Sequence, residues 1–152
     1  MILISAMTED RVIGAGDGMP WDVPEEYQQF LDLVAGQTIF MGRKSYEIFG
    51  PDLTTDHTVV LTRRGGVAGG AVAAASLDEA IDVARSFGKT VFCGGGASVY
   101  EQAMPRADAM YLSTIKGDYE GDTHFPEFSL GDWRVVEDRD HERFRFVRYE
   151  RG

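Results

Sequence analysis

Short apolar runs and amphipathic segments take turns along most of the chain. The runs are bounded by polar residues or glycine, as buried strands are, and lie at 2–7, 37–42, 57–62, 71–75 and 90–94. Segments with helical spacing lie between them at 43–50, 76–88 and 97–105, and a further helix is expected from Pro24 onward. Residues 108–115, 133–140 and 143–150 then alternate as strands do. This pattern predicts a single α/β domain over residues 1–152, with a mostly parallel central sheet of about eight strands, flanking helices and an antiparallel C-terminal edge strand.

Two of the expected helices carry signals at their starts. Asp22 is placed to cap the helix that begins near Pro24, and Ser76 with Glu79 forms a Ser-x-x-Glu capping box. Residues 8–23, before the first helix, are rich in glycine and aspartate and are expected to form a long loop. A loop of this length inside a compact domain is often functional.

The adjacent carboxylates Glu25 and Glu26 fall on different faces of the first helix. Because residues three and four apart share a face, Glu26 lies with the apolar Phe30 and Leu33. Glu25 lies with polar side chains such as Gln29 on the wet side. A buried carboxyl tends to have a raised pKa, as an acid that works near neutral pH requires. Glu26 is therefore a candidate proton donor; alternatively it lies at the rim of the core with its head group in water.

Charge and composition narrow the class of protein. The formal net charge of −10 disfavours nucleic acid and acidic membranes as partners. No apolar run approaches the roughly 20 residues of a transmembrane helix, and the N-terminus turns acidic too soon for a signal peptide. Cys93 is the one cysteine, which excludes an internal disulfide and gives no metal-ligand spacing. We therefore expect a cytoplasmic protein without a metal, a nucleic-acid partner or a membrane partner.

Glycines follow two of the expected strands and open the next helices. CGGGASVYEQ (93–102) places three glycines where backbone N–H groups can approach a phosphate, although a tight turn explains the pattern equally well. Gly42 opens a similar arrangement, and LTRR ends the following strand. Arg43 and Arg63, with the Thr62 hydroxyl, would select for a 2′-phosphate. The basic residues of the two stretches are Arg43, Lys44, Arg63 and Arg64. Together these features suit a phosphorylated dinucleotide such as NADPH.

Five blocks, in order and spacing, resemble dihydrofolate reductase over essentially the whole chain. They are DRVIGAGDGMPW (10–21), PEEYQQF (24–30), IFMGRKSYE (39–47), GGASVYEQAMPRAD (95–108) and YLSTIKGDYEGDTHFPEF (111–128). The resemblance implies a monomer that uses NADPH to reduce 7,8-dihydrofolate to tetrahydrofolate, with hydride transfer to C6 and protonation at N5. It also implies that residues 9–23 form a mobile loop that closes over the nicotinamide.

The same resemblance implies roles for individual residues. Glu26 would hydrogen-bond the pterin, with the Ser113 hydroxyl bonded to it, Trp21 anchoring a water and Tyr100 near the nicotinamide. The implied substrate-binding residues are Met19, Tyr27, Phe30 and Leu53. The implied cofactor-binding residues are Ala6, Ile13, Gly42, Arg43, Lys44, Ser45, Thr62, Arg63, Gly95, Gly96, Ala97, Ser98 and Val99. Gly95 and Gly96 match a pair that the family joins by a cis peptide.

Two positions depart from the family pattern. The family's Leu-Pro-Gly-Arg segment holds the folate glutamate tail through its arginine, and here it reads LTTD, with Leu53 retained and Asp56 in the place of the arginine. Gly94 stands where most members have Ile or Val, and is expected to open space or slacken the turn. Three functions stay open: a folate reductase with a weakened grip on the tail, a reductase of a tail-less pterin or a riboflavin-pathway pyrimidine, and a dinucleotide-binding module without turnover.

Overall fold

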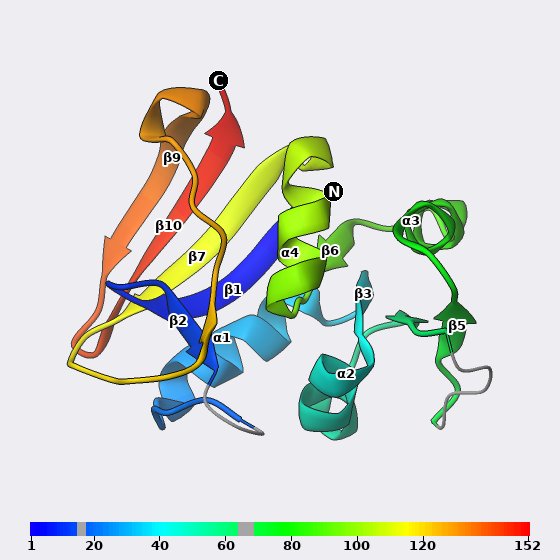
Figure 1. Cartoon of the computed structure of the whole chain (residues 1–152), viewed down its shortest axis with the longest axis horizontal. Helices are drawn as coiled ribbons and strands as arrows, with labels where there is room; N and C mark the ends of the chain where they lie inside the picture. Colours follow the sequence, from blue (N-terminus) through cyan, green and yellow to red (C-terminus); the bar gives the residue numbers. More distant parts are fainter. Residues whose placement is uncertain (15–17, 64–68) are drawn as a thin grey trace.

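The central sheet has eight strands in the order β5-β4-β3-β6-β1-β7-β10-β9 (Figure 1). The computed structural model describes residues 1–14, 18–63 and 69–152. Six strands run parallel: β5 (Val72–Ala74), β4 (His57–Leu61), β3 (Thr38–Gly42), β6 (Val91–Cys93), β1 (Ile2–Thr8) and β7 (Ala109–Ile115). β10 (Phe144–Arg151) is antiparallel to β7, and β9 (Trp133–Asp140) is antiparallel to β10. The predicted mostly parallel sheet is confirmed, and its antiparallel edge consists of two strands, with β9 outermost.

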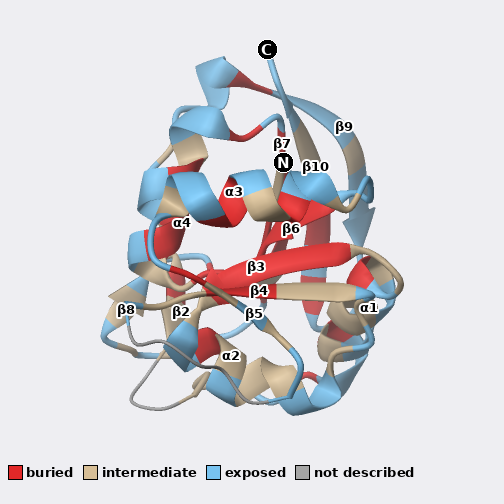
Figure 2. Cartoon of the chain, turned by 90° about the vertical axis from the view of Figure 1, so that its right-hand side faces the viewer, coloured by how far each residue is buried: buried red, intermediate tan, exposed pale blue. Residues whose placement is uncertain are grey.

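Helices cover both faces of the sheet (Figure 2). α3 (Leu77–Ser86) and α4 (Ala97–Ala103) lie on one face, and α1 (Pro24–Val34) and α2 (Arg43–Phe49) lie on the other. The alternation of side chains along β3 explains both layers. Phe40 belongs to the buried cluster that holds Ile81 of α3, whereas Ile39 and Met41 belong to the cluster that packs against Phe30 of α1. Single 3₁₀ turns follow at Gly50–Asp52, Met104–Arg106 and Leu130–Asp132.

The two helix-start predictions have opposite outcomes. The Ser76 cap of α3 is confirmed, because its hydroxyl accepts from the Glu79 amide at 3.1 Å, while the Glu79 carboxylate accepts at 3.0 Å from the amide of Ala75, one residue before the N-cap. The Asp22 cap is wrong. Val23 is the N-cap of α1 and the helix has no side-chain cap, because the Val23 carbonyl already receives the first helical amides and Asp22 lies one residue too early.

The segment 8–23 contains a short strand that the apolar pattern did not indicate. β2 (Val12–Gly14) pairs with β8 (Thr123–His124) as a separate two-stranded antiparallel sheet. Residues 15–17 of this segment lie outside the described residues. The Thr8 hydroxyl accepts from the Val12 amide at 3.0 Å, which closes the turn between β1 and β2. A strand of three residues is too short to show a period, so the prediction of loop throughout was wrong there.

Cys93 ends β6 and is completely buried. Burial raises the pKa of its thiol to about 12, so the side chain is a neutral part of the core at physiological pH. Within the described ranges, no helix is both long and apolar enough to cross a membrane.

Candidate active site

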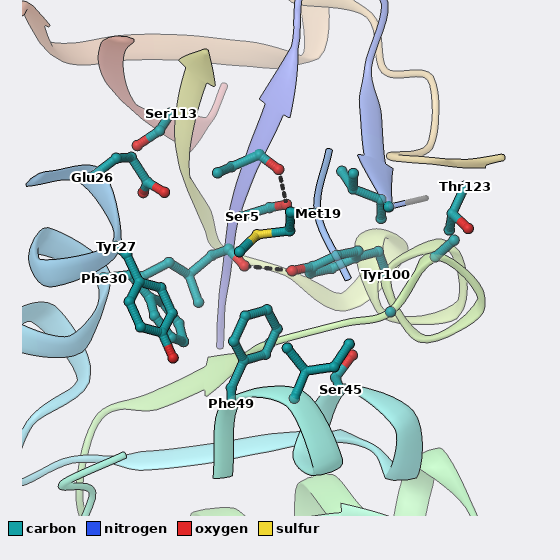
Figure 3. Close-up of a pocket in the computed structure, with 18 of the residues that line it drawn as sticks. Ser5, Met19, Glu26, Tyr27, Phe30, Ser45, Phe49, Tyr100, Ser113 and Thr123 are labelled. Carbon is teal, nitrogen blue, oxygen red and sulfur yellow. Dashed lines mark hydrogen bonds between the residues drawn. The ribbon is translucent and has the colours of Figure 1, made fainter. Parts of the chain in front are cut away.

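A cavity of about 330 Å³ lies where β3 ends at Gly42 and where Gly94 follows β6, beside the middle of β1 (Figure 3). α1 supplies one wall, α2 a second, and the start of α4 a third. Sites at the carboxyl ends of parallel strands are the common arrangement in α/β sheets, because the loops that leave the strands meet there. The volume is within the range of small-molecule sites, and polar groups enter it from several elements.

Glu26 extends from α1 into this cavity and is only 6% exposed. Loss of water raises its pKa from 4.5 to about 7, and a hydrogen bond with the Ser113 hydroxyl partly opposes that shift. The two side chains lie next to each other in Figure 3, one from α1 and one from β7. The carboxyl is therefore inward, as predicted, and it can hold or release a proton near neutral pH.

Glu25 has a different environment one residue earlier. Its carboxylate is exposed and forms a bidentate ion pair with Arg143, with one Nη2–Oε2 distance of 2.7 Å. The hydrogen bonds from Arg143 lower the pKa of Glu25, so this side chain stays ionised. The expectation of a solvated carboxylate holds for Glu25, but its ion pair with Arg143, which precedes β10, was not foreseen.

Aromatic side chains form the wall opposite the sheet. The ring centroids of Tyr27 and Phe30, both on α1, lie 6.1 and 5.6 Å from the ring centroid of Phe49 on α2. The Tyr27 hydroxyl donates to the Asp52 carboxylate at 2.6 Å, and burial together with that carboxylate raises its pKa. The wall can therefore hold a flat ring by apolar contact.

Two glycine turns meet at the other end of the cavity. The Gly42 amide donates to the Gly95 carbonyl at 2.7 Å, and the Gly95-Gly96 peptide is cis, as expected. Gly42 and Gly96 are the N-caps of α2 and α4, and neither helix has a side-chain cap. Arg43 and Lys44 line the cavity next to these turns. Backbone amides and cations in this arrangement suit a phosphate group.

Tyr100 fixes the second glycine turn in place. It is buried, and its hydroxyl donates to the Ile4 carbonyl at 2.6 Å (Figure 3). Gly95 has φ +92°, and a Cβ there would lie 2.7 Å from the Tyr100 ring, so only glycine fits. Burial strongly raises the pKa of Tyr100, which makes the group a hydrogen-bond donor and not a base.

Gly94 does not open space in the cavity wall, contrary to expectation. A Cβ at this position would lie 2.8 Å from the Met41 Cε and 2.9 Å from the Ile39 Cδ1, so those two side chains already fill the volume. The turn is not slack either, because the Gly94 amide donates to the Phe40 carbonyl at 2.9 Å. The space beside Gly94 is therefore occupied by the two β3 side chains.

Asp56 directly precedes β4 and does not line the cavity. Its amide donates to the Gln37 carbonyl at 2.9 Å, and its carboxylate forms an ion pair with Lys89 at 3.3 Å. The negative charge at this position is therefore partly neutralised by a neighbour that the sequence comparison did not suggest.

Most of the expected site residues line one cavity. Those that do are Glu26, Ser113, Tyr100, Met19, Tyr27, Phe30, Ala6, Ile13, Gly42, Arg43, Lys44, Ser45, Gly96 and Ala97. Those that do not are Trp21, Leu53, Thr62, Arg63, Gly95, Ser98 and Val99. Arg64 lies outside the described residues. Trp21 is buried in a cluster with Ile115 and Phe144, and Leu53 packs against the cluster of Ile39 and Met41.

Other lining residues were not predicted, among them Gln29, Ile48 and Phe49. Gln29 is half-buried, and its Nε2 donates to the Ser113 hydroxyl at 3.4 Å. Its position four residues after Glu25 predicts the wet side of the helix, but it is also three residues after Glu26 and shares the face of that residue. Ile48 and Phe49 follow Lys44 and Ser45 by four residues, which is the signal that identifies their face of α2.

The fold and the cavity together define an α/β enzyme that binds a nucleotide beside a buried acid. The family model for dihydrofolate reductase matches residues 1–151. Dihydrofolate reductase HdrB of Haloferax volcanii is 39% identical, over 99% of this chain and 82% of that protein. Dihydrofolate reductase of Bacillus subtilis is 34% identical over 88% and 79%. A solved structure of the Enterococcus faecalis dihydrofolate reductase, complexed with NADP(H) and RAB-propyl, superposes with a TM-score of 0.88 at 27% identity, over 99% of this chain and 95% of that chain.

The chain belongs to the dihydrofolate reductase family. The family, the fold and the enzyme class predicted from the sequence, an oxidoreductase of the dihydrofolate reductase type, are confirmed.

Proposed function

We propose that this enzyme transfers hydride from NADPH to C6 of 7,8-dihydrofolate and that N5 gains a proton, which gives tetrahydrofolate. The observation that carries the proposal is Glu26, a carboxyl 6% exposed, in the same cavity as the glycine turns and with its pKa raised to about 7. A module that only binds a dinucleotide gains nothing from a buried acid, since burying an ionisable group costs stability.

The residues around the cavity fit the cofactor. The uncapped N-termini of α2 and α4 offer amide groups to phosphates, and Arg43 and Lys44 add positive charge beside them. NADPH supplies the hydride when it is bound. The protein's part is to hold the two ring systems against each other, exclude water and keep a proton on Glu26.

Glu26 is the source of the N5 proton in the proposed reaction. With a pKa of about 7, Glu26 is about half protonated at neutral pH, whereas an exposed glutamate at that pH is ionised. Its neighbour Ser113 carries a hydroxyl that can exchange hydrogen bonds with either form of the acid. Turnover limited by proton supply therefore declines as the pH rises through about 7.

Replacement of Glu26 tests this role. Glu26→Gln should lower turnover near neutral pH by about 100-fold or more, the usual effect of removing a general acid, and should abolish the decline above pH 7. The KM for NADPH should stay unchanged. The measurement is steady-state NADPH oxidation between pH 5 and pH 9. Glu25→Gln is the matched control and should keep wild-type turnover; unchanged turnover in Glu26→Gln would exclude proton delivery by this residue.

The glutamate tail of the substrate decides between the proposed reaction and a second candidate. The position expected to bind the tail carries Asp56, which favours a reductase of a tail-less pterin or pyrimidine. Its ion pair with Lys89 reduces the repulsion that a free carboxylate would exert on a tail, and this supports dihydrofolate.

A comparison of substrates separates the two candidates. NADPH oxidation is measured with dihydrofolate and with tail-less dihydropterins on the wild type, Asp56→Asn and Asp56→Arg. If dihydrofolate is the substrate, Asp56→Arg should lower its KM by roughly tenfold or more, the value of one charged hydrogen bond. Asp56→Asn should change the KM for dihydrofolate less, and the KM for the tail-less compounds should be the same in all three proteins. Poor turnover of dihydrofolate by all three proteins, with rapid reduction of a tail-less ring, would establish the second candidate.

A further inference from the structure

Gln29 is a polar residue of α1 that lines the cavity. Among the described residues of α1 that line it, Gln29 is the only one with a side-chain amide, and this amide reaches Ser113, the hydrogen-bond partner of Glu26. Gln29 lies one turn after Glu26 on the same face of α1 and is half-buried. Its Nε2 donates to the Ser113 hydroxyl oxygen at 3.4 Å, across 84 residues of sequence. The two residues on the same helix therefore meet at one hydroxyl group on β7.

The hydrogen-bond capacity of Ser113 determines which group donates and which accepts in these two contacts. A serine hydroxyl has one proton to donate and lone pairs that accept. The amide group of Gln29 occupies a lone pair, and that leaves the hydroxyl proton free for the Glu26 carboxylate. Ser113 is only 2% exposed, so water does not compete readily for either bond. The result is a chain of donors that runs from Gln29 through Ser113 to Glu26.

We propose that Gln29 is a positioning residue, which orients the Ser113 hydroxyl so that its proton points at Glu26. The importance of Gln29 for catalysis rests on the proposed function. The hydrogen-bond chain itself rests only on the contacts of Gln29, Ser113 and Glu26. A donor aimed at the carboxylate stabilises its ionised form and so opposes the effect of burial. Gln29 thereby keeps the acid from holding its proton too tightly, and the group can give up a proton near neutral pH.

The other ionisable groups around Glu26 do not replace this chain. Glu25, on the same helix, is exposed and paired with Arg143. Tyr100, across the cavity on α4, stays neutral and donates to Ile4. From β7, Tyr111 lines the cavity, and the guanidinium of Arg148 on β10 lies 4.4 Å from the centre of its ring. The shift at Glu26 comes from burial and from Ser113, with no charged group among its causes.

The test is a double-mutant cycle read at Glu26 itself. The pKa of the Glu26 carboxyl is measured by ¹³C NMR titration of the ligand-free protein, with Glu26→Gln to assign the resonance. The proteins are the wild type, Gln29→Met, Ser113→Ala and the double variant. Gln28→Met is the matched control, because Gln28 is exposed on the same helix and donates to Asp32 at 2.8 Å. Gln29→Leu provides a second apolar replacement if the methionine variant folds poorly.

Gln29→Met should move the titration midpoint of Glu26 to higher pH by about half a unit, the effect of weakening one hydrogen bond to an ionised group. In the Ser113→Ala background the same change should have no further effect, and Gln28→Met should have none. The declining limb of the pH–rate profile should move by the same amount. An unchanged midpoint, or equal shifts in both backgrounds, would overturn the proposal. A shift that appears while even the wild type fails to turn over dihydrofolate would refute the proposed function and leave the role of Gln29 intact.

Discussion

At Glu26 the carboxyl loses water without gaining a cation, whereas Glu25, its neighbour in sequence, keeps its contact with water and pairs with Arg143. Helical periodicity separates these two residues, so the sequence alone identifies which one shares the apolar face, while the burial of its carboxyl is seen only in the structure. The family resemblance implies the contact of Glu26 with Ser113, but nothing in the sequence identifies Arg143 as the partner of Glu25 or Gln29 as a second partner of Ser113. Arg143 lies 118 residues from Glu25 and Gln29 meets Ser113 across 84 residues, and both contacts exist only because the sheet brings β7 and β10 next to α1.

The buried acid should also be visible in stability. The folded-state pKa of Glu26 is raised above its unfolded value, so the native protein binds more protons than the unfolded chain between about pH 4.5 and pH 7. Stability from this residue therefore declines as the pH rises through that window and is lowest above it. Glu26→Gln should remove this penalty, which is about 3 kcal/mol at pH 8 and close to zero at pH 4.5. Urea unfolding of both proteins at the two pH values measures it. A gain from Glu26→Gln that is equal at both would show that the carboxyl is not desolvated.

At the scale of helices and strands, the apolar pattern predicted every strand of the central sheet but not the order of the outer pair. β9 and β10 have similar alternating sequences, and only the structure shows that β10 pairs with β7 while β9 takes the edge (Figure 1). The small sheet of β2 and β8 was missed, because strands of two and three residues carry no period. The Ser76 cap of α3 was found because its signal is local to Ser76 and Glu79.

The Ser76 cap of α3 should contribute to the stability of the protein. Ser76→Ala leaves an amide of the first turn without its acceptor and should lower the free energy of unfolding by about 1 kcal/mol. Ser86→Ala is the matched control, since Ser86 is an exposed serine at the other end of α3 and donates to the Val83 carbonyl. Chemical denaturation at one pH compares the variants. Equal losses in both would indicate that the Ser76 cap contributes nothing particular to the helix.

For the whole molecule, net charge is the dominant long-range property. The formal charge of −10 produces mutual repulsion in the folded state, and the ion pairs that offset it include exposed ones such as Arg134 with Glu150 and Lys116 with Asp140. Exposed pairs of this kind contribute at most about 1 kcal/mol each. Composition gives this net charge without any structure, but the pairing of each charge required the fold.

Salt should therefore stabilise the protein at neutral and higher pH. Raising sodium chloride from about 20 mM to about 300 mM shortens the screening length several-fold, and the melting temperature at pH 8 should rise because repulsion is screened more than short ion pairs are. At pH 5, close to the sequence isoelectric point of 4.7, the rise should be smaller. Thermal unfolding monitored by circular dichroism measures both. A lower melting temperature in salt at pH 8 would mean that the surface ion pairs outweigh the repulsion.

Because Cys93 is buried, the reactivity of its thiol reports how often the surrounding part of the sheet opens. The chain has one thiol, which is fully covered and directly precedes the glycines of the candidate cofactor turn. An alkylating reagent can reach the sulfur only when β6 separates from its neighbours, so the rate of labelling measures how often that part of the sheet opens. A ligand that holds the glycine turn closed slows the labelling. Occupancy of the site can thus be followed by mass spectrometry on the unmodified protein, without turnover and without an introduced probe.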